Sequence, residues 1–83
     1  MGIKELLEQL QQSGYQNIRV LDDGCVVGTT DLLYTRAVCI GLNEHSWECR
    51  YCYEDRGLAT NACNALSSED DEPLPGYVAT RGR

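Results

Sequence analysis

The sequence contains no phenylalanine, one tryptophan, one histidine and two prolines among its 83 residues. Leucine, valine, isoleucine and the five tyrosines must therefore supply the large side chains of any core. A single histidine leaves little scope for the Ser–His or Cys–His pairs of nucleophilic catalysis. No Gly-rich loop precedes a helix in a phosphate-binding arrangement. We therefore expect no catalytic residues and no enzymatic activity.

Basic residues are also scarce. Seven stand against 13 acidic residues, which gives a net charge of -6 and a pI near 4.5. This charge favours solubility and disfavours direct binding to nucleic acid or to an anionic membrane. We expect a protein partner or a homodimer instead.

Long apolar runs are absent, so no segment approaches the ~20 apolar residues of a membrane span. The first residues also lack the apolar stretch of a signal peptide. We expect a cytoplasmic protein whose five cysteines are reduced. A chain of 83 residues has room for one small core.

Two segments have the apolar spacing of amphipathic helices. Residues 3–13 repeat apolar side chains every three or four positions, at Ile3, Leu6, Leu7 and Leu10. Residues 58–66 do the same at Leu58, Ala62 and Leu66. Gly14 stands where a left-handed residue can end the first helix.

The segment between these helices alternates as β-strands do. Asp22-Asp23-Gly24 predicts a hairpin turn between residues 17–21 and a return strand that starts at Cys25. Residues 28–30 predict a bend or a bulge. Residues 33–42 and 47–54 predict a second hairpin.

The pattern of this second hairpin selects its register. A four-residue loop places the bulky pairs Arg36–Tyr53, Val38–Tyr51, Ile40–Cys49 and Leu42–Trp47 on one face. The small and charged pairs Thr35–Glu54, Ala37–Cys52, Cys39–Arg50 and Gly41–Glu48 then share the other. A slip of one residue would mix the two faces, so the alternation itself fixes the pairing.

These elements predict an α+β fold, in which an antiparallel sheet of three to four strands carries an N-terminal and a C-terminal helix packed mainly on one face. Residues 1–68 are expected to form a single α+β domain. Residues 69–83 are expected to form an acidic loop and an extended C-terminal arm, with residues 76–80 as an arm or a last edge strand.

Three thiols and an imidazole suggest one possible metal site. His45, Cys49, Cys52 and Cys63 are the ligand types of structural zinc. Cys49 and Cys52 lie inside a predicted strand, however, where residues three apart point to opposite faces. We expect no metal and no other cofactor, with a zinc-binding module as one alternative. A thiol-redox or sensor protein, using Cys39 and Cys52, is the other.

The leading hypothesis is a non-enzymatic accessory or adaptor protein that associates with itself. The small-residue face would let another sheet or helix approach closely, unless one of the chain's own helices covers it. Its candidate interaction residues are Ala37, Cys39, Gly41, Glu48, Arg50 and Cys52.

The stretch from Arg36 to Thr80 resembles small uncharacterised proteins encoded by bacteriophages and other mobile genetic elements. The resemblance rests on residues 37–42, residues 49–54, an alanine-containing helix, an acidic turn and Pro75-Gly76-Tyr77. It implies no activity and no functional residue. It favours an accessory protein that acts by binding another protein.

Overall fold

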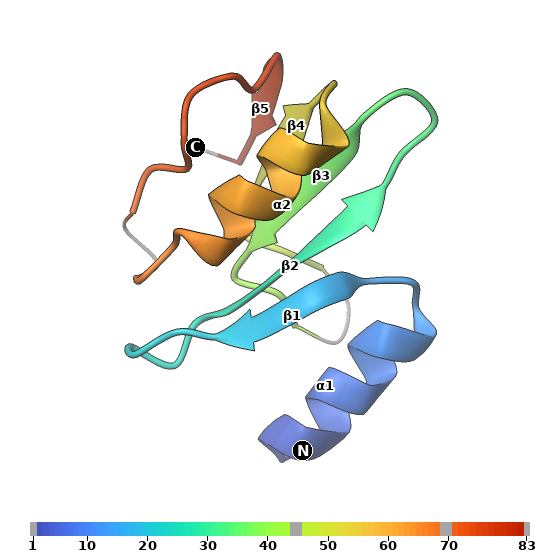
Figure 1. Cartoon of the computed structure of the whole chain (residues 1–83). Helices are drawn as coiled ribbons and strands as arrows, with labels where there is room; N and C mark the ends of the chain where they lie inside the picture. Colours follow the sequence, from blue (N-terminus) through green and yellow to red (C-terminus); the bar gives the residue numbers. More distant parts are fainter. Residues whose placement is uncertain (1, 44–45, 69–70, 83) are drawn as a thin grey trace.

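The computed structural model describes residues 2–43, 46–68 and 71–82. Its elements follow the order α1 (Ile3–Gln12), β1 (Gln16–Val20), β2 (Val26–Asp31), β3 (Arg36–Ile40), β4 (Cys49–Tyr53), α2 (Arg56–Asn64) and β5 (Ala79–Arg81). The strands form one antiparallel sheet in the order β1-β2-β3-β4-β5 (Figure 1). The α+β class is confirmed, but the sheet has five strands rather than three or four, because the C-terminal arm adds β5 beside β4.

The predicted register of the second hairpin is confirmed within the sheet, but the predicted face of Leu42 and Trp47 is wrong, because both lie in the cluster that contains Ala37 and Cys39. The five Cα pairs of β3 and β4 are Arg36–Tyr53, Ala37–Cys52, Val38–Tyr51, Cys39–Arg50 and Ile40–Cys49. Alternation then divides the hairpin into two faces. Val38, Ile40 and Tyr53 are fully buried on one face, and Ala37 and Cys39 are fully buried on the other.

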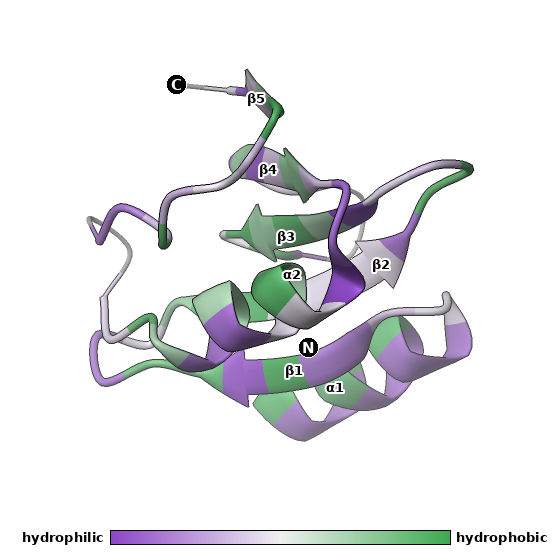
Figure 2. Cartoon of the chain, turned by 45° about the horizontal axis from the view of Figure 1, so that its top comes forward, coloured by the Kyte–Doolittle hydropathy of each residue, from purple (hydrophilic) through white to green (hydrophobic). Residues whose placement is uncertain are grey.

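The two helices pack on opposite faces of the sheet, so the prediction that both lie mainly on one face is wrong. α2 contributes Ala59, Ala62 and Cys63 to the cluster that contains Val38. The leucines of α1 belong to the cluster that contains Ala37. Both views show β1 lying between the two helices (Figures 1 and 2). We call these surfaces the α2 face and the α1 face.

Both helix ends have a local cause. Gly14, at φ +98°, follows the end of α1 in the left-handed conformation predicted for it. The Asp55 carboxylate accepts a hydrogen bond from the Leu58 amide at 3.1 Å and caps α2, which therefore starts before the predicted residue 58. Leu58, expected on the buried stripe, is 41% exposed.

The bulge lies in β1, and the prediction of a bend or bulge at residues 28–30 is wrong. These residues continue β2, whereas the register of β1 shifts between Gln16 and Arg19. Asn17 has a φ of +52° at that shift, a conformation that asparagine tolerates better than most residues. The Thr29 hydroxyl donates to the Gln16 carbonyl at 3.2 Å.

The C-terminal arm is held against the sheet by tyrosines. The Tyr53 hydroxyl donates to the Leu74 carbonyl at 2.5 Å. The Tyr77 ring meets Tyr51 and Tyr53 edge-on, at centroid distances of 5.0 and 6.0 Å. The Val78 amide donates to the Cys52 carbonyl at 2.8 Å, where the arm joins β4.

Neither α1 nor α2, the helices of the described part of the chain, has the length and apolar character needed to cross a membrane.

We expect Ala37→Leu to destabilise the protein by about 1–3 kcal/mol, because Ala37 is fully buried under α1 and three added carbons must displace its neighbours. Urea unfolding measures this change, and the exposed Ala65→Leu is the control. An unchanged unfolding midpoint for Ala37→Leu would mean that α1 does not cover this face.

Candidate anion-binding site

The small-residue face is covered within a single chain. Ala37 and Cys39 are fully buried and Cys52 is 8% exposed, beneath a layer that includes the leucines of α1. These three predicted interaction residues therefore offer no open surface for another sheet or helix. Gly41 is half-buried, with the Glu48 side chain lying across it.

The predicted zinc ligands are not brought together. Cys49 and Cys63 belong to the cluster on the α2 face, while Cys52 belongs to the cluster on the α1 face. His45 lies outside the described residues. Among the residues that the structure describes, no group of three or more His, Cys, Asp or Glu side chains could hold a metal ion.

Two of the buried cysteine thiols, Cys39 and Cys63, sit in surroundings that disfavour reactivity. All five cysteines are free of disulfides. Burial raises the pKa of Cys39 to about 12 and the pKa of Cys63 to about 11. Cys39 and Cys52 share the α1-face cluster, as expected. The attacking species of thiol chemistry is the thiolate, so a buried thiol with a pKa near 12 is a poor redox centre.

Two arginines lie directly opposite each other on the α1 face. Arg50 of β4 pairs with Arg81 of β5, two positions from the pair Cys52–Ala79. Directly opposed side chains share a face and lie close together, so two positive charges here repel each other. Cys52 belongs to the α1-face cluster, and alternation therefore places both arginines on that face.

Neither guanidinium has an acceptor among the described residues. The Nε atom of Arg50 is buried and has no hydrogen-bond partner, and Arg81 forms no ion pair with any residue that the structure describes. Other arginines differ in this respect. Arg36 donates to Asp31 at 2.7 Å, and Arg19 donates to the Cys63 carbonyl at 2.5 Å. A buried donor without an acceptor costs free energy that a ligand can recover.

Two aromatic side chains border the arginine pair. The Arg50 guanidinium carbon lies 4.9 Å from the centroid of Trp47, a cation–π distance that orients the guanidinium. Tyr15 follows α1, and burial raises the pKa of its hydroxyl, as does interaction with Cys39, while the charge of Arg50 lowers it. Tyr15 packs against the cluster that contains Cys39.

A hollow of about 350 Å³ adjoins this site through Trp47. Its lining residues are mostly polar and uncharged: Leu10, Ser13, Tyr15, Thr30, Asn43, Ser46 and Trp47. The volume is at the lower end for a small-ligand site. The hollow shares only Trp47 with the positive centre, which we define as Trp47, Arg50 and Arg81 and call the arginine site.

One negatively charged side chain, Glu48, lies close in sequence to the positive charge of Arg50. Glu48 directly precedes β4, two residues before Arg50. Its Cβ and Cγ lie over Gly41, whose φ of +75° and lack of a side chain make room for them. No ion pair links Glu48 to Arg50 or Arg81.

Sequence reasoning identified one member of this site. Arg50 is among the predicted interaction residues, whereas Trp47 and Arg81 are not. No sequence signal indicated Arg81, because its position opposite Arg50 follows from the pairing of Ala79 with Cys52, which the structure alone shows.

No family model matches this chain, and no curated protein or solved structure matches it either. The resemblance to proteins of mobile elements therefore stays a prediction.

The buried thiols generate a chemical prediction. At pH 8 in native buffer we expect Cys39 and Cys63 to resist alkylation by iodoacetamide, since their raised pKa values keep both thiols protonated. Peptide mass spectrometry measures this, and the urea-unfolded chain, in which all five cysteines should react, is the control. Equal rates for Cys39 in the folded and unfolded chain would contradict its burial.

The same shifts predict a pH dependence of stability. Above pH 9 the unfolded chain releases these thiol protons, while the folded chain keeps them until about pH 11 to 12. The free energy of unfolding should therefore be unaffected by these groups below pH 9 and should fall as the pH rises above it. Urea titrations from pH 8 to 10.5, with a Cys39→Ser/Cys63→Ser variant as control, measure their share.

Proposed function

We propose that the protein is a non-enzymatic binding protein, and that its arginine site captures an acidic segment of a partner protein. The observation that carries this proposal is the opposition of Arg50 and Arg81 across β4 and β5 with no acceptor for either guanidinium among the described residues. The chain has 13 acidic residues. Two arginines that pair with none of the described acidic residues support a role for an anion from another molecule.

A protein carboxylate fits this site better than a nucleic acid. Guanidinium groups form bidentate hydrogen bonds with carboxylates as well as with phosphates. A net charge of -6 opposes a long polyanion, since its repulsion sums over the whole molecule. A short acidic segment meets the two arginines locally and carries fewer charges into the surrounding negative field.

The arginine site also supports binding rather than catalysis. A positive pair on a sheet surface positions an anion, but a catalyst needs a nucleophile or a proton-transfer group near the reacting atom. Cys39, the buried thiol that pairs with Arg50 across β3 and β4, has a pKa of about 12.

Trp47 makes the binding test direct, because it is the only tryptophan and lies in the site. We expect a deca-glutamate peptide to change the Trp47 fluorescence in a saturable way that weakens with added salt. Arg50→Gln/Arg81→Gln should weaken binding by more than about tenfold, since two charge-assisted hydrogen-bonding groups are lost.

The matched control is Lys4→Gln/Arg56→Gln, which removes the same charge at two exposed positions away from the site. It should bind the peptide nearly as well as the unaltered chain. Equal loss in both variants would show that net charge alone attracts the peptide. Tighter binding of a ten-nucleotide oligothymidine than of deca-glutamate would overturn the choice of a protein partner.

A stability measurement separates a binding role from a structural one. Arg81→Gln should raise the free energy of unfolding by about 0.2–1 kcal/mol, because it removes a like-charge pair. The gain should shrink in 1 M NaCl, and Arg81→Lys, which keeps the charge, should show none. A loss of stability in Arg81→Gln would instead mean that Arg81 holds β5 in place.

A further inference from the structure

The last strand of the sheet is held by little besides its backbone. β5 is three residues long, and Ala79, Thr80 and Arg81 are all exposed. It lies at the end of the strand order and pairs with β4 alone (Figure 1). β5 therefore lacks the burial of side chains that stabilises β3 and β4.

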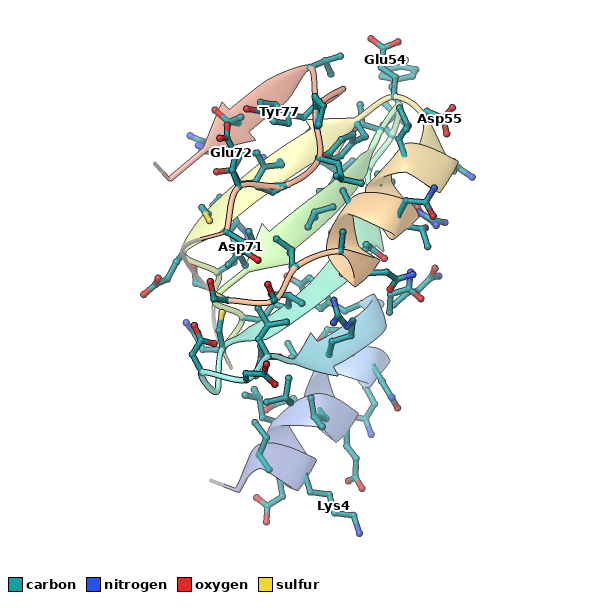
Figure 3. The ribbon with its side chains drawn as sticks, turned by 60° about the vertical axis from the view of Figure 1, so that its left-hand side comes forward. Lys4, Glu54, Asp55, Asp71, Glu72 and Tyr77 are labelled. Atoms are coloured by element: carbon teal, nitrogen blue, oxygen red, sulfur yellow. The ribbon has the colours of Figure 1, made fainter. Side chains whose placement is uncertain are left out.

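The apolar anchor of the C-terminal arm lies before β5. The Tyr77 ring packs edge-on against two tyrosines of β4, and its hydroxyl donates to Glu72 at 3.0 Å (Figure 3). Val78, the next residue, is 57% exposed, and its amide donates to the Cys52 carbonyl at 2.8 Å. The edge of the sheet can therefore open from Val78 onward while Tyr77 stays packed.

Electrostatic repulsion opposes the docking of β5 on β4. Arg81 lies directly opposite Arg50, and like charges in opposed positions destabilise a sheet. This repulsion is present while β5 is docked and disappears when β5 leaves β4. The charge of Arg81 therefore shifts the equilibrium toward the released strand.

We infer that anion binding at the arginine site and docking of β5 stabilise each other. This inference rests on the proposed function, since it requires an anion at that site. An anion between the two guanidinium groups replaces their repulsion by attraction and supplies an acceptor for the buried Nε of Arg50. When β5 is released, Arg81 leaves with it and the anion meets Arg50 alone. The anion thus binds the docked state more tightly and shifts the equilibrium toward it.

Gly82 makes the docked position sensitive to a single methyl group. Its φ is +99°, and a Cβ there would collide with the Glu48 carbonyl oxygen and lie 2.9 Å from the Cα of Cys49. A residue without a side chain is required where two backbones approach so closely. Gly82→Ala should therefore displace the end of β5 while leaving both arginines and the net charge unchanged.

Hydrogen exchange of the Val78 amide, followed by NMR in the full chain, measures the docking of β5. Saturating deca-glutamate should slow this exchange by at least about fivefold, the lower end of the usual coupling between two sites. The Leu32 amide, which donates to the Thr35 carbonyl at 2.8 Å in the turn between β2 and β3, is the control and should exchange at an unchanged rate. Equal slowing of both amides would show a general effect of the peptide and overturn the inference.

The charge of Arg81 provides a second test, without any peptide. Arg81→Gln should slow Val78 exchange by about two- to fivefold, because the repulsion is removed, and deca-glutamate should then slow it little further. Arg81→Lys, which keeps the charge, should exchange like the unaltered chain. Faster exchange in Arg81→Gln would show that Arg81 holds β5 in place, and would overturn the inference.

The reverse coupling is tested by Gly82→Ala. Because linked equilibria are reciprocal, loss of docking should weaken deca-glutamate binding, measured by Trp47 fluorescence, by the same factor of at least about five. Gly24→Ala is the matched control, since Gly24 also has a positive φ, +85°, but a Cβ there would meet nothing within 4 Å. Equal binding by Gly82→Ala and the unaltered chain would overturn the inference and leave the proposed function standing. Absence of peptide binding to the unaltered chain would overturn both.

Discussion

The pairing of β3 with β4 is the contact on which the other elements depend. Its register directs Val38, Ile40 and Tyr53 to one face and Ala37 and Cys39 to the other. The bulky face meets a helix whose buried residues are small, namely Ala59, Ala62 and Cys63, while the small-residue face meets the leucines of α1. At both helix–sheet interfaces large side chains therefore pack against small ones, which allows each interface to reach the packing density of a protein interior.

Sequence reasoning recovered the register because its signal is local. Eight residues of alternating size on each side of a short loop permit only one pairing that keeps the faces distinct. The side of the sheet that each helix covers is not a local property, since it depends on matching the helix to the side chains beneath it. β5 was predicted only as one of two alternatives, an arm or a last edge strand at residues 76–80, because its three exposed residues carry no apolar pattern and their pairing with β4 is set by contacts distant in sequence. The arginine site depends on β5, so only Arg50 was identified from the sequence.

The distribution of charge gives the arginine site its significance. A chain of net charge -6 could have supplied acceptors for every arginine, and it does so for Arg36. Arg50 and Arg81 instead lie opposite each other on β4 and β5. Arg50 also contacts Trp47, the only tryptophan in the sequence.

The most direct test of the arginine site is the two-dimensional NMR spectrum of the arginine Nε–Hε groups during titration with deca-glutamate. The account predicts large, saturable shifts for Arg50 and Arg81, with the buried Nε–Hε of Arg50 gaining an acceptor. Arg19 and Arg36, whose guanidinium groups already have acceptors, should barely move. Small, equal shifts of all arginine signals would mean that the peptide senses only overall charge, and would contradict the account.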